Sequence, residues 1–294
     1  MRVTGGHILE LAAAATSTAQ SKVADATEVA SSGLRVQVPS DDPVAWAQAQ
    51  RAKVREALGA GRATTLGASQ DWLTQTDGAL ATIQSVVTQA RTIAVQAGNA
   101  TYDASSRAAL GQQVTRLFQA ALAAANAQGS SGEYLLAGSK GQTQPFDPTG
   151  VYQGDAATRS INTAEQGQQV ATVAGSMLTA ANGVDVLPEL QNLATALSTN
   201  NLAGIQTAIG TLQTATSQIS SAREQAGSGL AALSAAADAT ASLDTHLQTV
   251  ASGLVDADVV TAASNLAQAT NALTANQTIT AHVISTLAAA INNA

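Results

Sequence analysis

The chain has 294 residues, of which 45% are hydrophobic, 2% aromatic and 11% charged, and its net charge is −7. Because 66 of the hydrophobic residues are alanines, the chain can form thin, closely packed helices but not a large aromatic core. No apolar run reaches the ~18 residues of a membrane span, so we expect no membrane insertion. No cationic patch suits nucleic acid, so we expect no nucleic-acid partner. Cysteine is absent, which excludes disulfides and thiolate chemistry.

Charge is distributed unevenly along the chain. Residues 1–160 carry 12 Lys/Arg and 12 Asp/Glu, whereas residues 161–294 carry one cation, Arg223, and eight acidic residues. The N-terminus has an apolar stretch that is interrupted by Glu10 and lacks a cleavage pattern. By itself this predicts a cytoplasmic protein, or export by a route that uses no cleaved signal.

The first predicted elements are a helix, an extended segment and a helix start. Small and apolar residues recur with helical spacing over residues 7–32, and Gly33 suits a helix end. Proline at position 39 favours an extended chain over residues 34–39. The next helix begins at a motif of two carboxylates and a proline. The carboxylates can cap free backbone N–H groups, and proline fits the first turn of a helix. This motif is Ser40, Asp41, Asp42 and Pro43.

Helices and a small β-rich insert are expected in the middle of the chain. The spacing predicts one helix from Pro43 to about Leu66, a second over residues 71–98 and a third over residues 103–128. Glycine, proline and tyrosine then become frequent up to Gly183, which indicates short strands and turns. The candidate strands are residues 134–138 and 150–155.

Helical spacing returns at Pro188, pauses at Asn200-Asn201, and continues to Leu254. The last forty residues follow a seven-residue repeat. One row of the repeat contains Val259, Leu266, Leu273, Thr280 and Leu287, and the row four positions on contains Ala263, Thr270, Gln277, Ile284 and Ile291. A lone helix of this composition is marginal in water.

We therefore predict that the two terminal helices pair and are buried in a larger assembly, while Leu266 and Leu273 lie largely in water in the monomer. The expected assembly interface consists of Ile8, Ala15, Val29, Val259, Leu266, Leu273, Ile284, Leu287 and Ile291.

Three groups of residues are candidate chemical sites. They are Asp41 with Asp42 as paired carboxylates, His7, His246 and His282 as ligands or bases, and Tyr134, Phe146 and Tyr152 as a ligand pocket. Capping explains the carboxylates, the histidines fall in separate helices, and three aromatics in a small insert more often form its core. We expect no enzyme activity, cofactor or metal.

Several motifs resemble those of the bacterial flagellin superfamily, and within it of the hook–filament junction proteins. They are Met1–Thr4, Ser31–Arg35, Pro39–Pro43, Asp71–Leu73, Asp77–Leu80, Arg91–Asn99, Gly132–Gly138, Pro145–Asp147 and Tyr152–Asp155. The prolines at 39 and 43 favour the junction proteins over filament flagellins. The final residues, 287–294, depart from the leucine-rich ending common in the superfamily.

The resemblance implies a mainly α fold, an elongated helical bundle with a coiled coil formed by both chain ends and a small β-rich insert. The implied segments are 1–40 (coiled coil), 41–128 (shaft), 129–185 (outer insert), 186–254 (shaft) and 255–294 (coiled coil pairing with 1–40). The implied role is an adapter layer between hook and filament, outside the cell, reached by flagellar type III export.

Implied partners are the hook-side junction protein, flagellin, the filament cap during growth, an export chaperone on the C-terminal helix, and further copies of the chain. A short filament flagellin and a soluble coiled-coil binding module remain alternatives.

Overall fold

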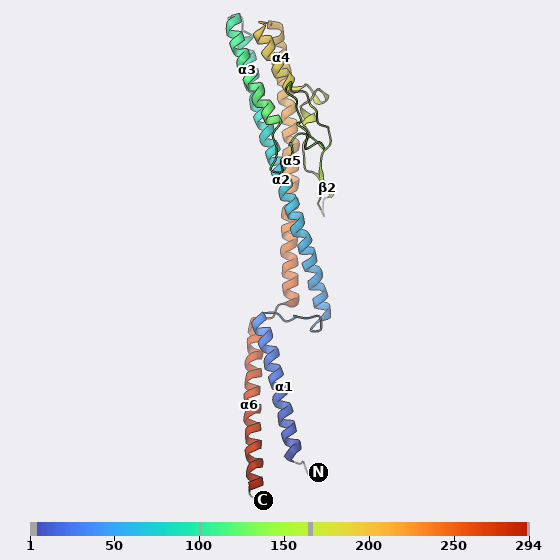
Figure 1. The fold of residues 1–294 in the computed structure, drawn as a ribbon, viewed down its shortest axis with the longest axis vertical. Coiled ribbons are helices and arrows are strands. Elements are labelled where there is room, and N and C mark those ends of the chain that lie inside the picture. The colour runs from blue at the N-terminus through green and yellow to red at the C-terminus, as the bar shows by residue number, and fades with distance from the viewer. Residues whose placement is uncertain (1–4, 100, 164–166, 293–294) are drawn as a thin grey trace. The chain divides into compact units, whose positions relative to one another are not determined.

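The computed structural model describes residues 5–99, 101–163 and 167–292. Within these residues the chain forms six α-helices, two strands and two short 3-10 turns (Figure 1). The helices are α1 (Gly5–Ser32), α2 (Pro43–Ala97), α3 (Ala104–Ala125), α4 (Val186–Ser198), α5 (Leu202–Val255) and α6 (Val259–Asn292). The mainly helical fold with a small β element is confirmed.

The chain divides into two compact units. The terminal unit contains residues 1–58 and 243–294, and the central unit contains residues 59–242. In the terminal unit α1 packs along α6, so the two ends of the chain pair as the sequence predicts (Figure 1). The long helices α2 and α5 contribute a stretch to each unit.

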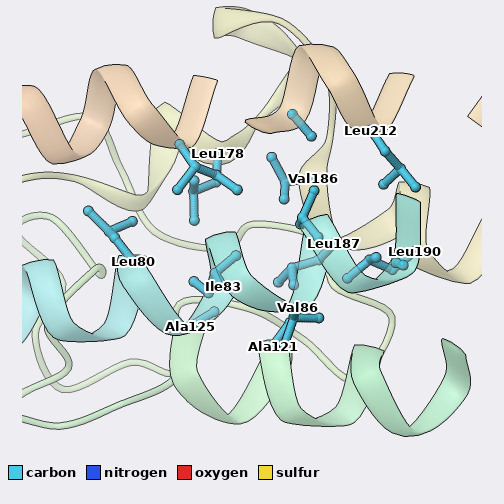
Figure 2. Packing of buried hydrophobic residues seen from close by; sticks show 14 of the residues in the cluster. Leu80, Ile83, Val86, Ala121, Ala125, Leu178, Val186, Leu187, Leu190 and Leu212 are labelled. Carbon is cyan, nitrogen blue, oxygen red and sulfur yellow. The ribbon is translucent and has the colours of Figure 1, made fainter. Parts of the chain in front are cut away.

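The central unit is held by a core of aliphatic side chains and alanines (Figure 2). The side chains labelled there come from α2, α3, α4, α5 and the 3-10 turn Gly175–Leu178: Leu80, Ile83, Val86, Ala121, Ala125, Leu178, Val186, Leu187, Leu190 and Leu212. Leu80, Ile83, Ala121 and Ala125 are fully buried. The alanines at positions 121 and 125 let the helix backbones approach closely, which compensates for the shortage of large apolar residues.

The break expected in α2 between Leu66 and Asp71 does not exist, because α2 is one helix of 55 residues. A glycine inside a helix, here Gly67, costs only about 1 kcal/mol relative to alanine. Leu66 and Leu73 on either side are 1% exposed and belong to the central core. Burial of these leucines outweighs the local penalty.

The strands also differ from expectation. Strands β1 (Ser160–Thr163) and β2 (Gly167–Val170) form an antiparallel pair in which Ser160 lies opposite Val170. The runs predicted as strands make single bridges instead, Gln128 with Tyr134 and Phe146 with Tyr152. Glycines with positive φ, at positions 138 and 150, turn the backbone at the ends of these runs and prevent longer ladders.

Aromatic residues do form part of the insert's core. Phe146 is buried, and its ring lies 5.1 Å from that of Tyr152. The Tyr152 hydroxyl is 2.9 Å from the Leu136 carbonyl oxygen and 2.7 Å from that of Asp155. Burial and the nearby Asp155 charge raise the pKa of Tyr152 to about 12, so this hydroxyl remains a proton donor that ties loops together.

Candidate assembly interface

The seam between α1 and α6 is a narrow stripe of small residues. On α6 the half-buried or buried positions alternate three and four residues apart: Ala262, Leu266, Ala269, Leu273, Asn276, Thr280 and Val283. On α1 the corresponding positions are Ala12, Thr16, Ala19, Val23, Ala26 and Val29. This alternation is the spacing of a coiled-coil seam.

Polar groups also occupy the seam. The hydroxyl oxygens of Thr16 and Thr280 lie 3.3 Å apart, within hydrogen-bond distance, and Asn276 is a further polar residue of the seam. Each hydroxyl also lies within hydrogen-bond distance of a carbonyl of its own helix, Ala12 for Thr16 and Asn276 for Thr280, so neither polar group is left unsatisfied in the seam.

The predicted interface residues divide into two sets. Val29, Leu266 and Leu273 lie in the seam and are half-buried. The expectation that the two leucines lie largely in water in the monomer is therefore wrong, because α1 covers them. Outside the seam, the exposed fractions are 38% for Ile8, 73% for Val259 and 52% for Ile284, and Ala15 is exposed as well. The side chains of Leu287 and Ile291 lie outside the described ones. Assembly roles for the residues outside the seam stay a prediction.

The second row of the predicted heptad was placed one position too far along the chain. The row that faces α1 is three positions after the leucine row, at Ala262, Ala269, Asn276 and Val283, whereas Ala263, Thr270, Gln277 and Ile284 are exposed. Heptad spacing alternates three and four, and both rows contain alanine and polar residues. Composition alone therefore does not distinguish them.

A groove runs along one side of the seam. Its volume is about 470 Å³, and it is lined by Lys22, Asp25, Ala26, Val29, Ala262, Asn265, Gln268, Ala269 and Ala272. Two helices packed through alanines leave such a groove because neither carries side chains large enough to fill it.

The two carboxylates of the helix-start motif have different roles, and only Asp42 caps the helix. Asp42 Oδ1 accepts a hydrogen bond of 2.9 Å from the Ala45 backbone N–H, which caps α2, and this bond lowers the pKa of Asp42. Asp41 Oδ2 accepts from the backbone N–H groups of Val38 and Gln37, which lowers its pKa and closes the preceding turn. Ser40 is exposed, and Pro43 is the first residue of α2.

Arg35 is the residue of this region whose role the sequence analysis missed. Its backbone N–H donates to the Val255 carbonyl at 2.7 Å, and its guanidinium donates to the Leu254 carbonyl at 2.6 Å. The same guanidinium lies 3.5 Å from Asp42 Oδ2. A cation at the last carbonyls of a helix is favourable, so Arg35 joins the extended segment after α1 to the end of α5. The signal in the sequence that could have indicated this role is an arginine placed just before a helix-capping motif.

A second missed feature is the start of α2. Its alanines at 45, 49 and 52 are buried, and they share clusters with Leu247, Ala251 and Val255 of α5. The large aliphatic residues of the same stretch, Val44, Val54 and Leu58, are at least 60% exposed. Their spacing on the face opposite the alanines is visible in the sequence.

The histidines and acidic residues do not converge. Among the residues with assigned positions, no group of three or more His, Cys, Asp or Glu side chains is placed to hold a metal ion. His7 has one acidic neighbour, Glu10, at 3.9 Å on the same exposed helix face. None of the helices in the described part of the chain is both long and apolar enough to span a membrane.

Residues 8–141 match the family model of the bacterial flagellin N-terminal helical region. The flagellar hook-associated protein 3 of Salmonella typhimurium is 30% identical over 128 residues, 43% of this chain and 40% of that protein. The Escherichia coli protein of the same name is 27% identical over 210 residues, 69% and 64% of the two chains. The chain thus spans about two fifths and just under two thirds of these relatives.

Solved structures share the fold. A putative flagellar hook-associated protein from Vibrio parahaemolyticus aligns with a TM-score of 0.68 at 16% identity, over 74% of this chain and 100% of that one. Flagellar hook associated protein-3 from Legionella pneumophila gives 0.59 at 16% identity, over 70% and 97%. Over residues 8–141 the sequence is thus similar to the bacterial flagellin N-terminal helical region, and the fold is that of solved flagellar hook-associated proteins.

Proposed function

We propose that this chain is a structural protein of the bacterial flagellum that forms an adapter layer joining the hook to the filament. The observation that carries the proposal is the pairing of the two chain ends through a seam of alanines, threonines and single leucines. Such a pair buries little apolar surface by itself, so packing against further helices supplies the missing stabilisation. The names of the relatives support the junction role over that of a short flagellin.

In this proposal, residues 1–40 and 255–294 form the coiled coil of the assembly. Residues 41–128 and 186–254 form the shaft, and residues 129–185 form an outer insert. The partners are the hook-side junction protein, flagellin, further copies of the chain, the filament cap during growth, and an export chaperone that holds the C-terminal helix. The protein reaches the flagellum by type III export and has no catalytic role.

The direct test is deletion of the gene in its host. Cells should then carry hooks without filaments and release flagellin into the medium, and the wild-type gene should restore filaments. Hooks that keep their filaments would contradict the proposal and favour a filament subunit or a module without flagellar function.

A variant connects this test to the seam. Leu266→Asp with Leu273→Asp places two carboxylates between α1 and α6, where an unpaired charge is costly. We expect this variant to fail to restore filaments. The matched control is Thr270→Asp with Gln277→Asp, which adds the same charges to the exposed face of the same helix and should restore them. Equal behaviour of the two variants would contradict a role for the seam.

A further inference from the structure

The first four turns of α2 have an inverted distribution of side chains. The alanines pack against α5, and the large aliphatic residues face solvent. The exposed fractions are 66% for Val44, 60% for Val54 and 64% for Leu58. Burial of a valine or leucine side chain is worth about 1.5–3 kcal/mol, so exposing three of them on one helix forgoes stabilisation that the alanines do not replace. Exposed apolar residues gathered on one face mark an interaction surface.

This surface is also basic. Val44, Arg51 and Leu58 are seven residues apart and fall on one line of the helix, with Val54 and Arg55 beside them. At 1.5 Å per residue the stripe is about 21 Å long. It contains a hollow of about 310 Å³ lined by Gln50, Arg51, Val54 and Arg55. We call these residues, Val44, Arg51, Val54, Arg55 and Leu58, the basic stripe.

The matching chemistry lies elsewhere in the same unit, at the link between α5 and α6. Val259 is 73% exposed and Val260 is 79% exposed. They follow two exposed acidic residues, Asp256 and Asp258, and Asp258 caps α6 through a hydrogen bond of 2.8 Å from the Val260 backbone N–H. No lysine or arginine follows Arg223 in the sequence, and the neighbouring Arg35, which is bonded to the Leu254 carbonyl, already has Asp42 as its acidic partner. We call residues 256–260 the acidic link.

We propose that the basic stripe of one molecule docks on the acidic link of a second copy of the chain. Both surfaces combine exposed aliphatic groups with charge, and the charges are opposite. The stripe is not complementary to itself, because a two-fold contact would bring Arg51 and Arg55 against the same arginines. A stripe-to-link contact that is not reciprocated between the same two copies is heterologous, and repetition of such contacts generates a ring or a helical layer. The inference deepens the proposed function by naming surfaces through which copies meet.

Cysteine cross-linking tests which surfaces meet. The natural chain contains no cysteine, so Val54→Cys and Val260→Cys each introduce a single thiol at an exposed position. We expect an equimolar mixture of the two full-length variants to form a covalent dimer on oxidation, while each variant alone remains monomeric. A mixture of Val54→Cys with Val95→Cys, whose side chain is 54% exposed in the central unit, is the matched control. Dimers from Val54→Cys alone, or equal yields from both mixtures, would overturn the inference.

Charge reversal tests the chemistry of the contact. Arg51→Glu with Arg55→Glu should raise the concentration needed for self-association at least about tenfold in sedimentation experiments. Addition of Asp256→Lys chains should recover part of that loss. Arg116→Glu, a reversal at an exposed position of α3, should have little effect. Chains that sediment as monomers at every concentration, or equal losses from Arg116→Glu and the stripe variant, would overturn the inference.

The outcomes separate this inference from the proposed function. If the stripe variant self-associates normally but does not restore filaments in cells, the stripe binds another protein; the inference then fails while the proposed function stands. If the mixed disulfide forms while deletion of the gene leaves filaments attached, the proposed function fails and the contact between copies stands.

Discussion

Arg107 is a buried cation that connects three segments of the central unit. It lies on α3 and is 7% exposed. Its Nε donates to the Ala97 carbonyl at 2.9 Å, Nη2 donates to the Asn99 carbonyl at 3.0 Å, and Nη1 donates to Asn200 Oδ1 at 2.7 Å. One guanidinium thus ties the end of α2 to the turn between α4 and α5.

The perturbation is Arg107→Met, which keeps most of the aliphatic stem and removes all three hydrogen bonds. Hydrogen bonds to charged groups contribute about 1.5–3 kcal/mol each, and the acceptors that remain lose their partner. The arginine itself no longer has to be desolvated, which offsets part of the loss. We therefore expect the free energy of unfolding to fall by about 3 kcal/mol rather than by the full sum.

Fluorescence can report on the central unit alone. Trp72 lies in the central unit and Trp46 in the terminal unit, so a Trp46→Phe background leaves Trp72 as the probe. Urea unfolding of the full chain should show a lower midpoint for Arg107→Met with an unchanged slope. The control is Arg116→Ala on the exposed face of α3, which should change stability by less than about 0.5 kcal/mol. Equal midpoints for wild type and Arg107→Met would refute the tie.

Three further changes test other parts of the chain. Asp42→Asn should lower the thermal unfolding midpoint near neutral pH, and the difference from wild type should vanish in acid. The pKa of Asp42 is lowered in the folded state, so its carboxylate stabilises the fold above the ordinary carboxyl pKa. That stabilisation is lost as the pH falls through the folded-state pKa. Gly150→Ala should destabilise the central unit by about 2 kcal/mol in urea, because φ is +82° and the added Cβ would lie 2.7 Å from Leu187 Cβ. Arg223→Met removes a bidentate pair with Asp77, at 2.8 and 3.1 Å, and should cost only about 1 kcal/mol in the same assay because both side chains are about one third exposed.

Local chemistry made part of this structure predictable. The motif that contains Asp42 and Pro43 predicted the start of α2, and helical spacing predicted the terminal helices, because both signals act over one or two turns. The continuity of α2 through Gly67 was not predictable, since it depends on burial of Leu66 and Leu73 against distant segments. Bonds between segments far apart in sequence, such as Arg35 with Leu254, leave no local pattern.

The row of α6 that faces α1 shows the same limit within one helix. Heptad spacing restricted the seam to two rows, and the choice between Ala262 and Ala263 depended on the position of a partner more than 200 residues away. The basic stripe is visible in the sequence, because Val44, Arg51 and Leu58 lie on one line of a helix whose opposite face contains alanines.

The hydrogen bonds that close the terminal unit set the order in which the chain can fold. Thr16 and Thr280 are 264 residues apart in sequence, and Arg35 and Leu254 are 219 apart. A chain that emerges N-terminus first cannot complete this unit until the residues of α6 have arrived. Prior folding of residues 59–242 takes most of the intervening chain out of the flexible loop and so lowers the entropic cost of closure. Pairing of α1 with α6 therefore has to wait until residues 259–292 have emerged, whichever compartment the chain folds in.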